Sequence, residues 1–272
     1  MIAILRDPPE DEADLIVEEL KKKTEVEIIM RDKFSYPMEI KSSTMLRWDS
    51  VEKKPISTII QYLEIFEKEM KIINNVDLIR IGENKGLMGY LFKKHNVPTP
   101  EFAVVDNVEQ ALKQAERIGY PVVMKPVAGT GGFDIVKFEN KKRLEEGSKR
   151  LFEKGKGAWI IQEYIEKPER DVRVVVIGGE VSIAYYRIGK GWVTNIHQGG
   201  TRKEFDGDKE ILEVAKNAAN AVGDGIFGVD VLEGKEYYVV ELNIKPGIPS
   251  SLPSLARKMS KDIADYVLEN AE

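Results

Sequence analysis

The 272-residue sequence contains no cysteine and only two histidines, His95 and His197. Without cysteine the chain forms no disulfide, has no thiolate nucleophile and binds no zinc through sulfur. Two histidines are too few for a histidine-rich metal site, and we expect each to be a surface or helix-capping group. These absences exclude thiolate chemistry and metal centres built from cysteines or several histidines.

The sequence also lacks a long apolar run and an excess of basic residues. No stretch approaches the ~20 apolar residues of a membrane helix, and the opening residues, MIAILRDPPED, lack the basic region and cleavage site of a signal peptide. The net charge is −5, whereas proteins that neutralise nucleic-acid phosphates usually have a basic bias. We therefore expect a cytoplasmic protein that binds neither membranes nor nucleic acid. The sequence leaves open whether the chain forms a homo-oligomer.

A glycine-rich stretch, Ala128–Gly132, follows Lys125 between two predicted strands. It is neither a G-x-x-x-x-G-K-[ST] loop before a helix nor the G-x-G-x-x-G that follows the first strand of a dinucleotide-binding domain. The bent backbone of such a turn can still direct N–H groups at a phosphate, with the Thr130 hydroxyl assisting. Glycine-rich hairpin turns are common, so this motif alone does not establish a nucleotide site.

The order of predicted elements divides the chain into three segments. Strands at 2–5, 25–30 and 44–48 alternate with helices at 8–23 and 57–70, which predicts a small, mostly parallel α/β domain. The later elements are predicted helices at 107–118, 141–153, 208–221 and 254–270, with strand-rich segments between them. We expect a mixed α/β fold with domains at 1–81, 82–160 and 161–272.

Two carboxylates and an amide near the C-terminus form a candidate metal site. The apolar runs Phe227–Leu232 and Tyr237–Leu242 flank the turn EGKE and predict a β-hairpin. With the turn centred within EGKE, Asp230 lies opposite Glu241 at about 5 Å, and Asn243 shares the face of Glu241. Such oxygen ligands suit Mg²⁺. The alternative is a hairpin whose polar face simply meets solvent.

The order of motifs from position 83 to the C-terminus resembles the ATP-grasp superfamily. Within it, the sequence resembles the RimK-like glutamate ligases that modify ribosomal protein S6 and the related LysX group. The matching segments are ENK with VPTP, YPVVMKP with GTGG, IIQEYIE with RDVRVVVIGGEV, VTNIHQGG, and GVDVLE with VVELNIKPG. The first 81 residues match the family's small N-terminal domain in pattern only. The resemblance implies an ATP-grasp fold behind a pre-ATP-grasp α/β domain.

The resemblance also implies roles for individual residues. The implied ATP-binding residues are Lys85, Lys125, Thr130, Gly131, Gly132, Glu163, Tyr164, Asp171 and Asn195, with Glu166 as an alternative to Asp171 at the ribose. The implied catalytic residues are Arg173, Arg187 and Asn195, and the implied ligands of two Mg²⁺ or Mn²⁺ ions are Asp230, Glu241 and Asn243. For the substrate we name Lys245, Gln198 and Arg202.

The implied activity is ATP-dependent amide-bond formation. The γ-phosphate would activate a carboxylate as an acyl phosphate, an amine would attack it, and cations such as Arg173 or Arg187 would stabilise the oxyanion. We expect a RimK-like ligase that adds an amino acid such as glutamate to a peptide or small-molecule carboxylate. The alternatives are a LysX-like biosynthetic ligase and, from another class, a non-catalytic ATP-binding scaffold.

Four residues depart from the RimK-like pattern. Val193 and Gln198 stand where the pattern has arginine, and Ile244–Lys245 replaces two small residues. The first two changes remove cations near the triphosphate and acyl phosphate, which Lys190, Arg202 or Lys245 would replace. A further hypothesis is that Lys245 pairs with a second carboxylate of the substrate.

Overall fold

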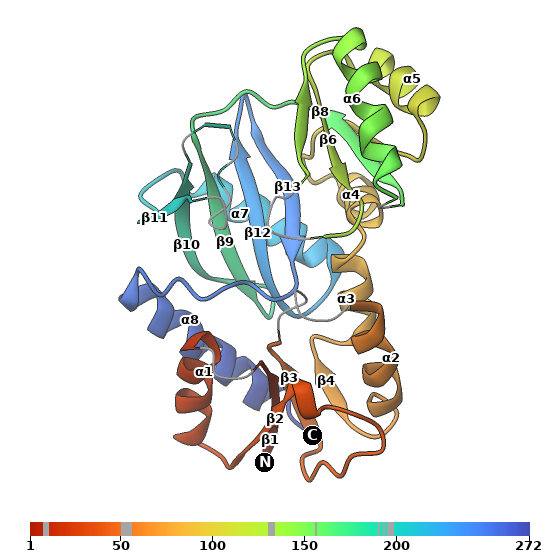
Figure 1. The fold of residues 1–272 in the computed structure, drawn as a ribbon. Helices are drawn as coiled ribbons and strands as arrows, with labels where there is room; N and C mark the ends of the chain where they lie inside the picture. The colour runs from red at the N-terminus through yellow and green to blue at the C-terminus, as the bar shows by residue number, and fades with distance from the viewer. Residues whose placement is uncertain are drawn as a thin grey trace.

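The chain forms three sheets stacked along one long axis, with both termini at the same end (Figure 1). The computed structural model describes residues 1–7, 11–49, 56–129, 134–155, 157–189, 191–192, 194 and 199–272. Within these residues, no helix combines the length and apolar character needed to span a membrane. The predicted mixed α/β class is confirmed.

The N-terminal sheet is entirely parallel and has the strand order β2-β1-β3-β4. Its strands are β1 (Ile2–Arg6), β2 (Val26–Met30), β3 (Thr44–Arg47) and β4 (Lys71–Ile73), with the short helix η1 (Arg31–Lys33) after β2. Helix α1 (Asp11–Lys21) covers one face, and α2 (Ile56–Phe66) covers the other. The predicted small parallel α/β domain is therefore present, and β4 is an element that the sequence did not reveal.

The central sheet is antiparallel, with the order β5-β8-β6-β7. Its strands are β5 (Phe102–Val105), β6 (Val122–Pro126), β7 (Val136–Phe138) and β8 (Trp159–Glu163). Helices α5 (Val108–Ile118) and α6 (Lys141–Glu153) pack on one face. Each begins where an asparagine side chain, Asn107 or Asn140, accepts a hydrogen bond from a first-turn N–H.

The third sheet is antiparallel and has the order β11-β10-β9-β12-β13. Its strands are β9 (Arg170–Ile177), β10 (Glu180–Ile188), β11 (Thr201–Glu204), β12 (Ile226–Glu233) and β13 (Tyr237–Asn243). Helix α7 (Glu210–Val222) covers one face and α8 (Pro253–Glu269) the other. The central strand β9 is buried almost throughout because its valines alternate between these two cores.

Helices α3 (Val76–Gly82) and α4 (Lys85–Lys94) connect the N-terminal sheet to the rest of the chain. Just before α3, buried Asn74 binds the third sheet through three hydrogen bonds. Its amide nitrogen donates to the carbonyls of Ile226 and Ile244, both at 2.8 Å, and its oxygen accepts from Ile226 N at 2.9 Å. Helix α8 returns to pack against α1. The N-terminal sheet is thereby joined directly to the β12–β13 hairpin.

The division at residues 81 and 160 stays a prediction. The first boundary lies at the end of α3, and the second lies within β8.

Candidate functional site

The β12–β13 hairpin places two carboxylates opposite each other, as its sequence predicts. Asp230 pairs with Glu241 and Gly228 with Asn243 in the antiparallel register. A Cβ atom at Gly228 would lie 3.0 Å from Arg173 Nη1, so glycine at this position leaves room for that guanidinium. The acidic side chains of the hairpin therefore lie beside Arg173 of the neighbouring strand β9.

Asp230 belongs to a buried chain of alternating charges that spans β9, β10 and β12. Arg173 donates to both carboxylate oxygens of Asp230, from Nη2 at 3.0 Å and from Nε at a shorter distance. Arg187 Nη2 lies 2.8 Å from Asp230 Oδ2, and Arg187 also donates to Asp171 at 2.7 and 3.0 Å. The Thr194 hydroxyl completes the chain with a short hydrogen bond to Asp171. Each guanidinium is thus held in a fixed orientation by a buried carboxylate.

The arginines keep Asp230 ionised despite its burial. Burial alone would raise the pKa of this carboxyl, but the charges and hydrogen bonds of Arg173 and Arg187 hold the pKa below its usual range. For Arg187, burial works to lower the pKa, and the charges of Asp230 and Asp171 outweigh burial and raise it. Asp230 and Arg187 therefore both stay charged in the neutral pH range.

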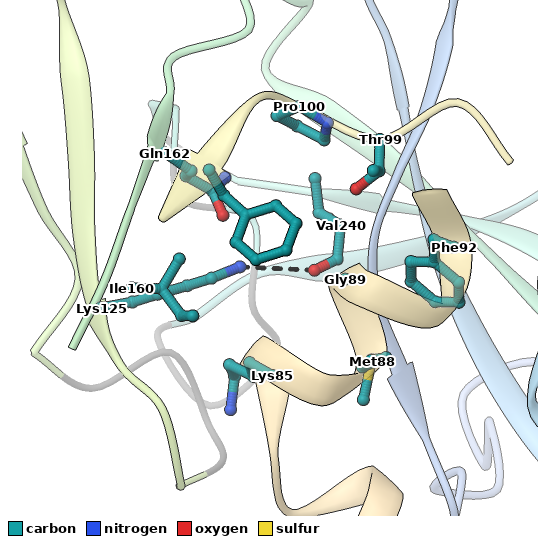
Figure 2. Close-up of a pocket in the computed structure, with 11 residues that line it drawn as sticks. Lys85, Met88, Gly89, Phe92, Thr99, Pro100, Lys125, Ile160, Gln162 and Val240 are labelled. Atoms are coloured by element: carbon teal, nitrogen blue, oxygen red, sulfur yellow. Dashed lines mark hydrogen bonds between the residues drawn. The ribbon is translucent and has the colours of Figure 1, made fainter. Parts of the chain in front are cut away.

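Two lysines approach the hairpin from the central domain. Lys85, in the first turn of α4, lies 3.3 Å from Glu241 Oε1 and also donates to the Gly129 carbonyl. Lys125, on β6, is buried and donates to the Val240 carbonyl at 3.3 Å. Figure 2 shows the Lys125 amine reaching toward β13, with Lys85 close by on α4. A small cavity between α4, β6, β8 and β13 lies beside both lysines.

Burial changes the chemistry of Lys125. It lowers the pKa of the ammonium group from 10.5 to about 8, an effect that Glu241 partly offsets and Lys85 reinforces. A polyanion placed here would favour the charged form of the amine. The two lysines therefore provide a cationic site for an anion that bridges the central domain and the hairpin.

Glu163 is the last residue of β8, and Tyr164 follows it. The backbone N–H of Tyr164 donates to the Pro121 carbonyl at 3.2 Å, which fixes the strand end against the residue before β6. The Tyr164 ring packs edge-on against Trp192 at 6.0 Å between centroids, and Lys137 Nζ lies 3.7 Å from the Tyr164 ring centre. These contacts hold the tyrosine ring in place at the strand end.

The oxygen donors of the hairpin fit a hard divalent cation. Asn243 donates its amide nitrogen to the Gly228 carbonyl at 3.3 Å, so its amide oxygen is directed elsewhere. Glu241 adds a carboxylate, and carboxylate and amide oxygens are ligands that Mg²⁺ prefers. Both oxygens of Asp230 accept hydrogen bonds from Arg173, and Oδ2 also lies 2.8 Å from Arg187, so Asp230 would have to release an arginine to bind a metal. Among the described residues no group of three or more histidine, cysteine, aspartate or glutamate side chains could hold a metal. A metal here would use the oxygens of Glu241 and Asn243, joined by Asp230 when an arginine releases it, with other ligands completing the shell.

Among the described residues, the structure places the remaining predicted residues in no hydrogen bond or ion pair with the two lysines or the hairpin carboxylates. Lys245, after Asn243, is half-buried, and Arg202 on β11 is paired in register with Arg187. Thr130, Gly131, Gly132, Asn195 and Gln198, together with Lys190, Val193 and His197, lie outside the described residues. Their predicted roles stay predictions.

Sequence reasoning did not identify Thr194 or Lys137 as parts of the site. Thr194 lies within the VTNIHQGG segment that was matched to the family, and it binds Asp171. No sequence signal distinguishes Lys137 from the many surface lysines. Asp171 was predicted to contact ATP; the structure shows hydrogen bonds from Arg187 to both of its carboxylate oxygens.

Comparison with known proteins shows the family to which the chain belongs. Residues 82–268 match the RimK-like ATP-grasp domain. The chain is 32% identical over 206 residues to the α-aminoadipate–LysW ligase LysX of Saccharolobus solfataricus, in an alignment that covers 74% of each chain. It is 31% identical over 231 residues to the tetrahydromethanopterin:α-L-glutamate ligase of Methanocaldococcus jannaschii, covering 82% of this chain and 76% of the relative.

A solved structure supports the same fold over the whole chain. The RimK domain ATP-grasp protein from Sphaerobacter thermophilus has a TM-score of 0.78 at 21% identity, covering 98% of this chain and 99% of that one. The family resemblance predicted from the sequence is therefore confirmed. The chain belongs to the RimK-like ATP-grasp family of ATP-dependent carboxylate–amine ligases.

Proposed function

We propose that this ligase joins an acidic amino acid, such as glutamate, to a carboxylate of a peptide or small molecule through an acyl phosphate. The observation that carries the proposal is the convergence of Lys85 and Lys125 on the hairpin that pairs Asp230 with Glu241. Carboxylates react poorly with amines at neutral pH, so transfer of the γ-phosphate must first create a good leaving group. The cationic site beside the hairpin suits the phosphates that this transfer requires.

The names of the relatives support an acidic amino acid as the amine. LysX of S. solfataricus is named for α-aminoadipate, and the M. jannaschii relative for L-glutamate. Both amino acids carry a second carboxylate. These relatives have nearly equal identity to the chain, so RimK-like glutamate addition and LysX-like biosynthesis are variants of one proposal.

In this proposal the two lysines bind the triphosphate. Lys125 is buried and fixed by the Val240 carbonyl, whereas Lys85 lies between Glu241 and Gly129. Glu163 and Tyr164, together with the predicted glycine turn Thr130–Gly132, would bind the rest of the nucleotide. Asp171 stays a proposed ATP contact, although its present hydrogen bonds position Arg187.

The hairpin oxygens would hold the divalent cation. Asp230, Glu241 and Asn243 supply the donor set, and we propose two Mg²⁺ or Mn²⁺ ions. When bound, such ions neutralise phosphate oxygens and align the transferred group. Asp230 would keep Arg173 and Arg187 pointed toward the same end of the hairpin.

The arginines are the proposed stabilisers of negative charge in the transition state. Both guanidinium groups are ion-paired on one side by buried carboxylates. A fixed cation needs little reorganisation when a tetrahedral oxyanion forms, which is why preorganised donors lower the barrier. Asn195 is also proposed to act here, and Lys245, Gln198 and Arg202 to contact the substrate. We place the reaction in the cytoplasm, without nucleic-acid or membrane partners, and leave homo-oligomerisation open.

A nucleotide-coupled panel assay tests this proposal. Purified protein with Mg²⁺-ATP is mixed with pairs of one amine and one carboxylate, and ADP release is recorded for each pair. We expect release with an acidic amino acid as the amine, and a new amide in the mass spectrum of the acceptor. Binding of Mg²⁺-ATP without stimulated ADP release by any pair would overturn the proposal.

A further inference from the structure

Charged side chains are buried at the carboxyl ends of β1, β2 and β3 in the N-terminal sheet. Five of them are at least nine-tenths buried there: Arg6, Asp7, Arg31, Arg47 and Asp49. Arg6 pairs with Asp14, which lies outside these five, and Arg31 lies near both Asp7 and Asp49. Asp49 is also the ion-pair partner of Arg47. A buried guanidinium donor that meets no acceptor is unfavourable, so an anion that met such a donor would stabilise this edge of the sheet.

The cluster lies at a position where open parallel sheets commonly bind ligands. The strand order β2-β1-β3-β4 reverses direction between β1 and β3, and α1 and α2 cover opposite faces on either side of that point. Ligands of open α/β sheets bind at the carboxyl ends of the strands where the order reverses. Arg47 is the last residue of β3, at this point.

Within the cluster, Asp49 is shared between two arginines. Arg31 Nε lies 3.1 Å from Asp49 Oδ2, and Arg47 Nε lies 2.6 Å from Asp49 Oδ1. The Arg47 contact is a close ion pair, but it is not aligned as a hydrogen bond. Arg47 Nη2 is buried and has no hydrogen-bond acceptor among the described residues. A guanidinium has five N–H donors, so Arg47 keeps donors that its aspartate does not use.

Arg47 also lies near the junction of α3 and α4. Burial raises the pKa of Glu83, and the positive charges of Lys85 and Arg47 oppose that rise, while Glu241 adds to it. Arg47 and Glu241 therefore both act on Glu83 at this junction. Asn74 binds the same edge of the sheet to the β12–β13 hairpin through Ile226 and Ile244. A substrate that contacted both Arg47 and the hairpin would pass this junction.

We propose that Arg47 binds the second carboxylate of the amino-acid substrate and so selects an acidic side chain. The inference rests on the proposed function and names a specificity-determining contact for it. A guanidinium can meet a carboxylate with two parallel N–H donors, which recognises both its charge and its planar shape. Asp49 orients Arg47 from one side and leaves Nη2 available for the ligand.

A purely structural role would give a different arrangement. A structural buried arginine normally has its donors satisfied by protein acceptors, because an unsatisfied buried donor is costly. Here the one aspartate nearest Arg47 is also bound to Arg31. Among the described residues that buried donor at the reversal point of the sheet meets no acceptor, which favours a ligand over an internal ion pair.

Matched amino-acid probes test the inference. Titration calorimetry in the presence of Mg²⁺ and a non-hydrolysable ATP analogue compares L-glutamate with L-glutamine, and L-2-aminoadipate with L-norleucine. Each pair has the same chain length but differs in the terminal carboxylate. We expect the wild type to prefer the acidic member by about tenfold or more, and Arg47→Gln to lose that preference. Equal binding of both members by the wild type would overturn the proposal.

Two variants control for structural effects. Arg80→Gln removes a half-exposed arginine that pairs with Glu64, and it should keep the wild-type preference. Arg47→Lys keeps the positive charge but loses the pair of parallel N–H donors, so it should lose part of the preference for the acidic probe. This variant provides the test if Arg47→Gln does not fold. A wild-type preference in a folded Arg47 variant would overturn the inference.

The assay separates this inference from the proposed function. Selective binding of the acidic probes without ADP release would contradict the proposed ligation and leave Arg47 assigned as the carboxylate contact. ADP release that makes no distinction between L-glutamate and L-glutamine would support ligation and overturn the role of Arg47. If the proposed ligation and the role of Arg47 are both correct, Arg47→Gln should raise KM for the acidic amino acid about tenfold while changing KM for ATP less than about twofold.

Discussion

Replacing Lys125 with methionine should stabilise the protein without nucleotide while removing nucleotide binding. The ammonium group is buried, and burial lowers its pKa from 10.5 to about 8. That shift records the free energy that folding loses by carrying the charged lysine into the interior. Methionine has a similar length and no charge, so Lys125→Met removes this loss while filling most of the same space.

The size of the effect follows from the pKa shift. A shift of one pKa unit corresponds to about 1.4 kcal/mol. The lowering of the Lys125 pKa from 10.5 to about 8 therefore reduces the free energy of unfolding by about 3 kcal/mol at pH 7. Some of this gain is offset by loss of the hydrogen bond to the Val240 carbonyl, which contributes about 1 kcal/mol. We expect Lys125→Met to raise the free energy of unfolding by about 2 kcal/mol at pH 7.

The pH dependence gives a sharper form of the same prediction. Because the folded-state pKa is depressed, the unfolded chain binds more protons between pH 8 and 10.5, and the stability of the wild type rises with pH over that window. The charge penalty falls from about 3 kcal/mol at pH 7 to about 1.4 kcal/mol at pH 9.5. The advantage of Lys125→Met over the wild type should shrink accordingly.

Urea unfolding without nucleotide at pH 7 and pH 9.5 measures both effects, and calorimetric titration with Mg²⁺-ATP measures binding. Lys94→Met, at an exposed position of α4, is the matched control and should change stability by less than about 0.5 kcal/mol. The reasoning is refuted if Lys125→Met destabilises the protein at pH 7, or if its advantage does not shrink at pH 9.5. Unchanged ATP affinity would refute the assigned role of the lysine.

Three further changes follow from other buried contacts. Asp171→Asn should lower the free energy of unfolding by about 3 kcal/mol, because it leaves the buried Arg187 with one carboxylate in place of two; urea unfolding that matches the wild type would contradict this. Asn74→Ala should lower the free energy of unfolding by roughly 2 to 4 kcal/mol, because backbone groups of Ile226 and Ile244 lose their buried hydrogen-bond partner. Urea unfolding like that of the wild type would show that this contact does not join the domains. Glu241→Gln should lower kcat about 100-fold or more with little change in urea unfolding, and a wild-type kcat would exclude Glu241 from the metal site.

Much of the hairpin could be predicted from its sequence because local rules determine it. Strand alternation and the position of the EGKE turn were enough to place Asp230 opposite Glu241. The register shift between Asp230 and Val231 was not foreseen, since a β-bulge has no clear signature in these residues. The family motifs also named Lys85 and Lys125 as ATP-binding residues, and the structure places both beside that hairpin.

The remaining parts depend on contacts between residues far apart in the sequence. Strand β4 has only three residues, too few for a periodic pattern. The pairing of Arg187 with both Asp171 and Asp230 requires β9 to lie between β10 and β12. No local sequence pattern indicates that strand order. The sharing of Asp49 by Arg31 and Arg47 requires the ends of neighbouring strands to meet. Such contacts become visible only when the topology is known.

Transfer of oxygen from the acceptor to phosphate tests the central claim most directly. The acceptor that supports ADP release is labelled with oxygen-18 in its carboxylate, and the inorganic phosphate formed during turnover is analysed by mass spectrometry. An acyl phosphate route predicts that each phosphate carries one labelled oxygen and that ADP forms in equal amount. Glu241→Gln should slow the formation of both products about 100-fold or more. Unlabelled phosphate, or release of AMP and pyrophosphate in place of ADP, would contradict the acyl phosphate route.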